Sequence, residues 1–292
     1  MNQPPVAASP PLDALLPIDM ARKAEEIGVA KVRMPAAKAF TLAALAGAFI
    51  ALGANLSTVA VTGAAGVLPY GVTRLLAGAT FSLGLILVVV GGAELFTGNN
   101  LMVMAWANGK VRSGEVLRSW LLVYAGNFFG ALALAGLVLL SEQYLMAESK
   151  LGLTALTIAE AKCRLAPLQA VALGVLCNLL VCLAVWLCYS ARSVTDKVLA
   201  IVPPITAFVA GGFEHSVANM YFLPLALGIK HFAGPSFWQA IAKSPADFSN
   251  LTWPQALVGN LLPVTIGNLL GGAVLVGLVY WSIYLRQPAT GR

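Results

Sequence analysis

Long uncharged, apolar stretches dominate the pattern of hydrophobic and polar positions along this chain. They cover residues 39–73, 75–93, 119–140, 165–191, 198–213 and 251–285. A helix needs about 20 apolar residues to cross a hydrocarbon core of about 30 Å. The run ending at Ala93 continues past Glu94, and the run ending at Phe213 continues past Glu214. The pattern predicts an all-α integral membrane protein with six transmembrane helices, of which the second and the fifth are broken.

The two predicted breaks have the same sequence pattern. Residues 91–94 read Gly-Gly-Ala-Glu and are followed by Asn99, while residues 211–214 read Gly-Gly-Phe-Glu and are followed at the same spacing by Asn219. Paired glycines loosen a helix, and a carboxylate in hydrocarbon needs a partner. Equivalent interruptions in two halves of a membrane protein are typical of internal repeats whose broken helices meet at a functional site near the midplane.

The third and sixth predicted spans also match each other. Residues 126–130 read GNFFG, residues 267–271 read GNLLG, and Gly136 and Gly277 follow these motifs at the same distance. Three spans per half make the two repeats inverted. Close helix packing through small residues is the simpler role of the glycines themselves. The expected organisation is an N-terminal segment 1–36, a six-span domain 37–286 with repeats at about 37–141 and 165–286, and a tail 287–292.

The composition supports insertion into a membrane. Hydrophobic residues make up 59% of the chain and charged residues 10%, against about 45–50% and about 25% in soluble domains. Residues 18–27 predict a short amphipathic helix at the membrane surface. With the N-terminus in the cytoplasm, about two thirds of the 18 Lys and Arg residues lie on that side, which favours cytoplasmic N- and C-termini. The net charge of +6 reflects this bias and does not indicate nucleic-acid binding.

Polar side chains inside the predicted spans are the candidates for chemistry, because such groups are costly in hydrocarbon and mark pathways. His215 lies between two apolar half-spans, beside Glu214 and within reach of the matching break, and we interpret it as functional. His231 lies outside its span and is interpreted as structural or solvated. Glu94 and Glu214 can accept from backbone N–H groups that a broken helix frees, so we favour a loop-stabilising role over a proton relay.

The cysteines point to neither a metal nor a cofactor. Cys163, Cys177, Cys182 and Cys188 form no CxxC pair. Three of them fall inside one apolar run, where cysteine behaves as a small hydrophobic residue. We therefore expect them to serve packing.

Four motifs resemble those of the formate/nitrite transporter family, most closely its bacterial formate channels. The motifs are GGAELFTGN at 91–99, CNLLVCLAVW at 177–186, GGFEHSVANM at 211–220 and LPVTIGNLLGG at 262–272. The similarity runs from about Leu15 to Arg286. The resemblance implies an aquaporin-like helical fold in a bacterial inner membrane and a homopentamer whose protomers each hold a pore.

By motif position, the resemblance also implies roles for individual residues. It implies a pathway lined by the polar side chains His215, Thr97, Asn178, Asn219 and Lys162. It implies apolar constrictions at Phe81 and Phe208 on the outer side, with Leu85, Leu95 and Phe96 near the path. Lys162 would lie in the outer vestibule and draw a small anion toward the pore mouth. Without the resemblance, these residues fit core packing, bonds between helices and an ordinary surface lysine equally well.

The expected function is a channel or transporter, not an enzyme, for small monovalent anions. Formate is the first candidate substrate and nitrite the second, followed by hydrosulfide, acetate or lactate. Membrane lipid is the expected surrounding partner. Glu94 followed by Leu-Phe-Thr-Gly resembles the nitrite-type members, whereas formate members usually have Asp followed by Leu-Phe-Thr-Ser, so the preferred anion stays open. A central imidazole can donate to an anion, offset its charge or pass it a proton. Permeation of the anion and passage of the neutral acid are both consistent with the sequence.

Two alternatives come from other classes. A membrane-embedded redox subunit could use the buried histidine, but haem ligation usually needs a second axial ligand, and His231 is poorly placed for one. A neutral-solute channel of the aquaporin type would carry paired NPA motifs, which this chain lacks.

Overall fold

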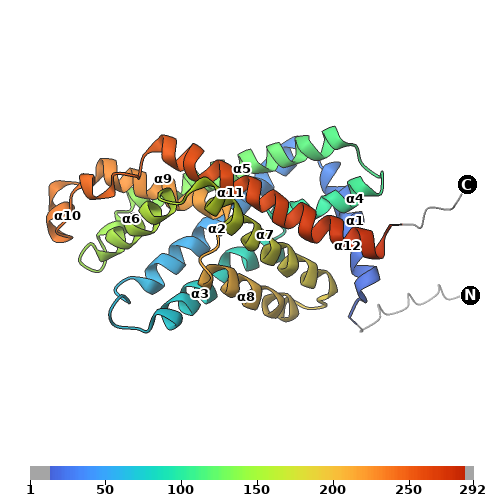
Figure 1. The fold of residues 1–292 in the computed structure, drawn as a ribbon, viewed down its shortest axis with the longest axis horizontal. Helices are drawn as coiled ribbons and strands as arrows, with labels where there is room; N and C mark the ends of the chain where they lie inside the picture. Colours follow the sequence, from blue (N-terminus) through green and yellow to red (C-terminus); the bar gives the residue numbers. More distant parts are fainter. Residues whose placement is uncertain (1–13, 287–292) are drawn as a thin grey trace, which may run out of the picture.

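The computed structural model describes residues 14–286, and this part of the chain is a bundle of helices (Figure 1). Residues 1–13 of the predicted N-terminal segment and the predicted tail 287–292 lie outside the described residues. The elements are, in chain order, α1 (Pro17–Val32), α2 (Ala36–Val61), α3 (Tyr70–Gly91), η1 (Gly98–Met102), α4 (Val103–Ala107), α5 (Ser113–Leu140), η2 (Gln143–Leu145), α6 (Lys150–Cys163), α7 (Pro167–Ser190), α8 (Val194–Ala210), α9 (Ser216–Phe232), α10 (Pro235–Ala240), η3 (Pro245–Phe248), η4 (Gln255–Leu261), α11 (Leu262–Leu269), η5 (Leu270–Leu278) and α12 (Val279–Tyr284).

Five of the described helical segments are long and apolar enough to cross a membrane. They are α2, α3, α5, α7 and the continuous segment Gln255–Tyr284, which includes the π-helical η4 and η5. α8 and α9 have 17 residues each and flank the second predicted break, so neither alone reaches the length of a full span. The fold is that of a multi-pass membrane protein, and six crossings in two inverted repeats stay a prediction.

The first two spans end at other residues than the uncharged runs predicted. α2 ends at Val61, and α3 already begins at Tyr70, before the charged Arg74 that separates the two runs. The turn between them contains Gly63 and Gly66, both with φ 76°, a left-handed conformation that glycine adopts easily. The pattern of charged residues cannot locate a turn that contains none, so the two glycines are the sequence signal for the boundary between α2 and α3.

Glycines of the repeated GNxxG motifs bring the backbones of two helix pairs into contact. Gly130 of α5 lies against α2, where a side-chain carbon would overlap the carbonyl oxygen of Ala44. Gly271 of η5 lies in the same way against Val175 of α7. A side-chain carbon at Gly136, by contrast, would meet nothing within 4 Å. Close packing therefore accounts for Gly130 and Gly271 but not for Gly136.

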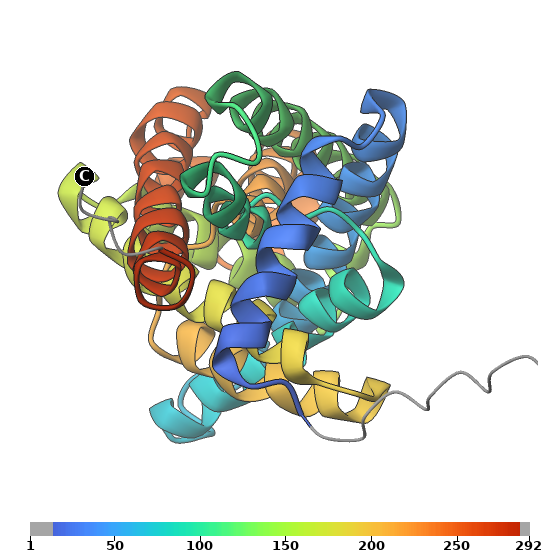
Figure 2. The same cartoon turned by 90° about the vertical axis from the view of Figure 1, so that its right-hand side faces the viewer.

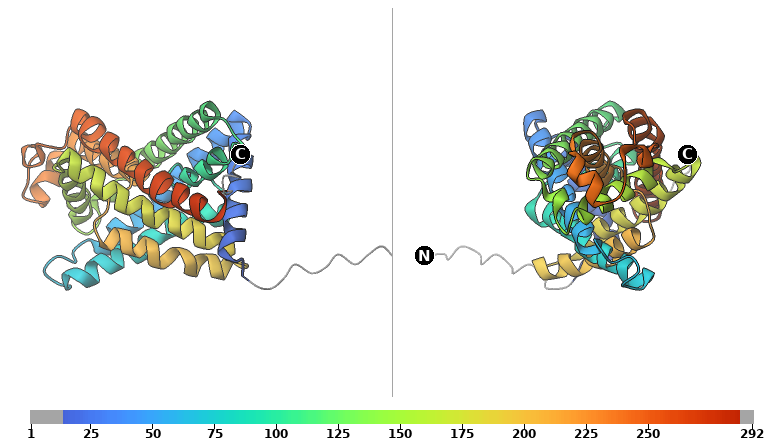
Figure 3. Two further views of the ribbon diagram at one scale, coloured as in Figure 1. Left: turned by 45° about the vertical axis from the view of Figure 1, so that its right-hand side comes forward. Right: turned by 90° about the vertical axis from the view of Figure 1, so that its left-hand side faces the viewer.

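Helix α1 lies across one end of the bundle, over α4, α5, α7 and α12 (Figures 2 and 3). It extends to both sides of the predicted residues 18–27. Met20 and Ala24 are buried and pack with Met104 and Trp186. The apolar face of this helix is thus covered by protein, whereas the sequence predicted contact with the membrane surface. The difference arises because the ends of several helices together form an apolar surface that no local pattern reveals.

Glu25 on the buried face of α1 ties the helix to the α4–α5 turn. Its carboxylate accepts hydrogen bonds from Asn108 Nδ2 and from Lys110 Nζ, the latter at 2.6 Å. We expect Glu25→Ala to weaken the docking of α1 by about 1–2 kcal/mol, since the bonds to a charged acceptor are lost and Lys110 is half-exposed. Limited trypsin digestion in detergent should then cleave α1 faster at Lys23 and Lys31.

Glu26→Ala provides the matched control for this experiment, because Glu26 is the exposed neighbour of Glu25 on the same helix. Equal cleavage rates for the two variants and the unchanged protein would show that Glu25 does not hold α1 in place.

Candidate functional site

The two predicted breaks lie at the ends of α3 and α8, which pack against each other. α3 ends at Gly91 and α8 at Ala210. The chain then turns through Gly92 at φ 76° and Gly212 at φ 73°, left-handed conformations that explain the glycine pair before each glutamate. A helix end leaves backbone groups without intrahelical partners, and neighbouring segments supply partners here.

The backbone of each glutamate is bonded in the same way in the two breaks. The N–H of Glu94 donates to the carbonyl oxygen of Leu42 on α2, and the N–H of Glu214 donates to that of Leu173 on α7, both at 3.2 Å. Each break is therefore attached to the first helix of its own half of the chain.

The asparagines of the GNxxG motifs repeat the same equivalence. Asn127 Oδ1 accepts from the N–H of Phe96, and Asn268 Oδ1 accepts from the N–H of Ser216, both at 2.9 Å. The Nδ2 atom of each asparagine donates to the carbonyl oxygen of the glutamate in its own break, again at 2.9 Å. Both asparagines are fully buried. Their side chains replace helical hydrogen bonds that the breaks interrupt.

The carboxylate of Glu94 is held by a side chain from α1. Lys31 Nζ lies 2.9 Å from both carboxylate oxygens and 2.8 Å from Asn99 Oδ1. Asn99 Nδ2 donates to Glu94 Oε2 at 2.7 Å. Helix α1 thus completes the first break as well as covering the end of the bundle.

The carboxylate of Glu214 has an equivalent set of partners. Lys162 Nζ of α6 lies 2.7 Å from Glu214 Oε1, and Asn219 Nδ2 donates to Oε2 at 2.7 Å. Asn219 Nδ2 also donates to Asn260 Oδ1 at 2.7 Å. The Lys162 side chain is only 13% exposed. Lys162 and Asn219, which the resemblance placed in the vestibule and on the pathway, therefore meet at Glu214.

Thr97 and His215 meet where the two breaks face each other. Thr97 Oγ1 and His215 Nε2 lie 3.0 Å apart, and both residues are buried. The other ring nitrogen, Nδ1, accepts from the N–H of Ala218 at 3.0 Å. A backbone N–H can only donate, so Nδ1 holds a lone pair and the neutral ring carries its proton on Nε2. Nε2 then donates to Thr97, whose own hydroxyl proton is left to donate elsewhere.

Asn178 lies directly beside this pair. Its Nδ2 atom contacts the carbonyl oxygen of Thr97 at 3.3 Å, Asn100 Oδ1 at 2.9 Å and the carbonyl oxygen of Asn268 at 2.7 Å. Asn178 therefore joins the first break to the last long helix and orients the loop that carries Thr97.

The central pair comes from positions that are not equivalent in the two breaks. His215 follows Glu214 directly, and the matching position in the first break holds Leu95. Thr97 lies three residues after Glu94, and the matching position in the second break holds Val217. At these two positions, each break therefore holds one polar and one apolar side chain.

Aromatic rings pack on one side of the central pair. Phe81 and Phe208 lie edge to face with centroids 5.4 Å apart, and Phe208 stacks on the His215 ring at 5.9 Å. Phe96 packs instead against Tyr124, with centroids 4.9 Å apart. Phe81 and Phe208 therefore adjoin the histidine, while Phe96 contacts α5.

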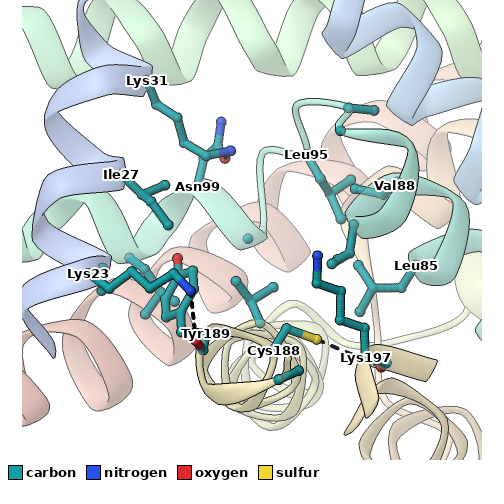
Figure 4. Close-up of a pocket in the computed structure, with 18 of the residues that line it drawn as sticks. Lys23, Ile27, Lys31, Leu85, Val88, Leu95, Asn99, Cys188, Tyr189 and Lys197 are labelled. Carbon is teal, nitrogen blue, oxygen red and sulfur yellow. Dashed lines mark hydrogen bonds between the residues drawn. The ribbon is translucent and has the colours of Figure 1, made fainter. Parts of the chain in front are cut away.

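A cavity of about 500 Å³ lies beneath α1, between the end of α3 and the α7–α8 turn (Figure 4). We call it the α1 cavity; its lining includes Lys23, Lys31, Leu85, Leu95 and Lys197. Neither Thr97 nor His215 lines it. The cavity opens next to the first break, on the side of the bundle that α1 covers.

Five residues that complete the two breaks were not predicted as site residues from the sequence, namely Lys31, Asn100, Asn127, Asn260 and Asn268. Asn127 and Asn268 carried a signal, because each is the asparagine of a repeated GNxxG motif. His231 is exposed, and the cysteines are buried and free. Within residues 14–286, no three or more His, Cys, Asp or Glu side chains are grouped so that they could hold a metal ion.

An apolar helical bundle whose broken helices enclose a buried polar pair defines a multi-pass membrane protein of the channel and transporter class. The chain belongs to the formate/nitrite transporter family, since its residues 18–282 match the family described as "Formate/nitrite transporter".

Individual relatives are similar over nearly their whole length. "Formate channel FocA" of Escherichia coli (strain K12) is 48% identical over 280 residues, which cover 96% of this chain and 98% of that protein. FocA of Haemophilus influenzae is 41% identical over 265 residues, 91% of this chain and 93% of that protein. A solved structure described as "Pentameric formate channel with formate bound" has a TM-score of 0.82 at 48% identity, covering 86% of this chain and 98% of that chain. An "FNT family ion channel" has a TM-score of 0.77 at 30% identity, covering 91% and 98%.

Proposed function

We propose that this chain is a passive or proton-coupled channel for small monovalent anions, with formate first and nitrite or hydrosulfide as alternatives. The buried contact between Thr97 and His215 carries the proposal, because two hydrogen-bonding side chains face each other between broken helices. Similarity to proteins described as formate channels supports formate as the substrate. Family members are channels or transporters, so we propose no enzymatic activity.

The proposed pathway lowers the cost of bringing an anion through an apolar constriction. Moving a bare ion into a low-dielectric medium costs on the order of 20 kcal/mol in the ideal case. We propose an outer constriction at Phe81 and Phe208 and an inner one at Leu85 and Leu95, with Phe96 beside the path. Between them the hydroxyl proton of Thr97 donates to the anion. His215 directs that proton, because its Nε2–H already occupies a lone pair of the Thr97 oxygen.

The tautomer of His215 sets a condition on proton coupling. A neutral ring that gave up its Nε2 proton would become an imidazolate anion. To protonate formate, the ring must first gain a second proton at Nδ1, where it now accepts from Ala218. We propose that the resting site is a neutral hydrogen-bond donor and that proton-coupled passage requires loss of the Ala218 contact.

The proposed supporting roles fall on the side chains around the central pair. Glu94 and Glu214 stabilise the loops of the two breaks. Asn178 and Asn219 are polar positions along the path, and Lys162 lies at the outer mouth, where it holds Glu214 in position. The proposed assembly is a homopentamer in a bacterial inner membrane, with six crossings in inverted repeats and cytoplasmic termini, which agrees with the pentameric state of the similar formate channel.

Lys162→Ala is expected to reduce formate flux about tenfold at both low and high salt. Steering by an exposed charge would make the loss largest at low ionic strength, since salt screens over about 8–10 Å. Lys162 is instead largely buried and bound to Glu214, and breaking a buried pair costs roughly 3–5 kcal/mol. Initial rates of formate uptake at about 10 mM and about 300 mM salt separate the two effects.

Lys162→Arg is the control, because it keeps the charge but changes the hydrogen-bond geometry. A loss of flux in Lys162→Ala that vanishes at high salt would favour long-range attraction of the anion by an exposed charge. It would contradict a role of Lys162 in positioning Glu214.

Competitive flux into proteoliposomes tests the proposed function. Formate should enter faster than nitrite and hydrosulfide between about pH 5 and pH 8, the range in which histidine titrates. Faster nitrite flux would change the order of substrates. Absence of anion flux from a correctly assembled protein would overturn the channel function, and a haem absorbance band of the purified protein would favour the redox alternative.

A further inference from the structure

The α1 cavity carries more positive than negative side chains. Lys23 and Lys31 line it from α1, Arg192 from the α7–α8 turn and Lys197 from α8. Among the described residues of the lining, Glu94 is the carboxylate, and Lys31 is bound to it. Within the described part of the lining, Lys23 and Lys197 therefore remain without a carboxylate partner after this ion pair is counted.

Lys197 contributes an ammonium group to the cavity without a partner among the described residues. Its Nζ makes no hydrogen bond or ion pair with any residue in 14–286, and Figure 4 shows it pointing into the cavity. The neighbouring carboxylate of Asp196 accepts instead from the backbone N–H groups of Arg192 and Ser193, at 3.0 and 2.9 Å. Lys197 thus presents an uncompensated, partly buried charge to the cavity.

Lys23 faces the same space from the opposite side. Its Nζ donates to the carbonyl oxygen of Tyr189 at 2.9 Å and has further N–H groups to offer (Figure 4). Burial, and after it the charges of Arg192 and Lys197, lower the pKa of Lys23 below its usual value. The cations are thus close enough to repel one another, and an anion between them would relieve that repulsion.

We propose that the α1 cavity binds a small dianion, either a C4 dicarboxylate or a tetrahedral oxyanion, between Lys23 and Lys197, and that the bound dianion blocks the pore at the proposed inner constriction, whose Leu85 and Leu95 line the cavity. The volume of about 500 Å³ exceeds more than tenfold the roughly 30 Å³ that a water molecule occupies in the liquid. A formate ion would leave most of it empty. The blocking effect rests on the proposed channel function, whereas the binding does not.

A dianion can enter the α1 cavity but cannot follow a monovalent anion through the pore. The cost of moving a charge into low dielectric grows with the square of the charge, so a second charge makes it about fourfold larger. Leu85 and Leu95, which also line the cavity, offer an anion no hydrogen bond from their side chains. A dianion held by two lysines therefore stays and competes with the transported anion.

Formate flux in proteoliposomes tests the block. Sodium succinate on both faces serves as the dicarboxylate, sodium sulfate in a parallel arm as the tetrahedral oxyanion, and sodium chloride at equal ionic strength as the control. We expect either dianion at about 20 mM to lower formate flux about threefold or more relative to chloride, since equal ionic strength gives equal screening. Lys197→Gln should abolish this difference and leave the flux in chloride unchanged.

Binding is measured separately, by thermal unfolding of the detergent-solubilised protein. A ligand that binds the native state raises the melting temperature, whereas a salt that is excluded from the surface stabilises every variant alike. We expect a rise of about 3 °C with succinate or sulfate over chloride that is lost in Lys197→Gln. Lys38→Gln is the matched control, because Lys38 is exposed and lies outside the cavity.

The outcomes separate this site from the proposed function. A response to only one of the two dianions supports the site and identifies its ligand chemistry. A melting shift that depends on Lys197 in a protein without formate flux supports the site and overturns the channel function. Equal flux and equal melting temperatures in the three salts, or a dianion effect that persists in Lys197→Gln, overturns the proposed site.

Discussion

Replacement of Thr97 by valine is expected to reduce formate flux about ten- to a hundredfold while the protein keeps its fold. Valine leaves the Nε2–H of His215 without an acceptor in buried surroundings, a loss of roughly 1–3 kcal/mol. It also removes the hydroxyl proton that we propose donates to the anion. The carbonyl oxygen of Thr97 still accepts from Asn178 Nδ2 and Cys182 Sγ, so the loop should keep its position.

Thr97→Ser is the matched control, because it keeps the hydroxyl and loses only a methyl group. It should retain formate flux within about threefold of the unchanged protein, a difference smaller than the loss of one buried hydrogen bond. Initial rates in proteoliposomes, with assembly checked by size-exclusion chromatography, distinguish the variants. Full flux in Thr97→Val would remove the hydroxyl from the mechanism, and equal losses in both variants would assign the effect to packing.

The second large effect is expected from Gly130→Ala, which should destabilise the bundle by about 3 kcal/mol or more. The new methyl group would overlap the backbone carbonyl of Ala44, so α2 and α5 would have to move apart. Overpacking commonly costs about 1–3 kcal/mol, and a backbone neighbour cannot yield as a flexible side chain does. The apparent melting temperature in detergent should fall by roughly 6–12 °C, with loss of the assembled form.

Gly136→Ala on the same helix is the control for this change. A methyl group at Gly136 would meet nothing within 4 Å inside the protomer, and alanine favours a helix over glycine by about 1 kcal/mol. Its melting temperature should therefore stay the same or rise. An unchanged melting temperature in Gly130→Ala would contradict the close approach of α2 and α5.

The helices and the two breaks could be predicted from local sequence. A long apolar run in hydrocarbon satisfies its backbone groups within the segment only as a helix. The glycine pairs before Glu94 and Glu214 mark the points where α3 and α8 end, as expected. The predicted boundary between α2 and α3 was less accurate, because the turn at Gly63 and Gly66 contains no charged residue.

The candidate site was predicted in part. The histidine could be singled out because an ionisable group between apolar half-spans is costly unless it has a function. Thr97 and Asn178 were placed by resemblance. In the structure, Thr97 lies within hydrogen-bond distance of His215, and Asn178 lies within hydrogen-bond distance of the Thr97 carbonyl oxygen. Lys31 could not be found in this way, because its partner Glu94 lies in another predicted segment and no spacing connects the two.

The sequence by itself determined that the chain forms apolar helices, where two of them break, and which residue types occupy the breaks, because these depend on neighbours along the chain. Only the tertiary structure decided how the polar groups are paired. The packing of α3 on α8 sets Thr97 against His215, and the start of α9 aims the Ala218 N–H at Nδ1. A hydrogen bond exists only where donor and acceptor meet at about 3 Å with the correct direction. The proton on Nε2 is therefore a property of the fold, since it depends on groups that residue order alone does not bring together.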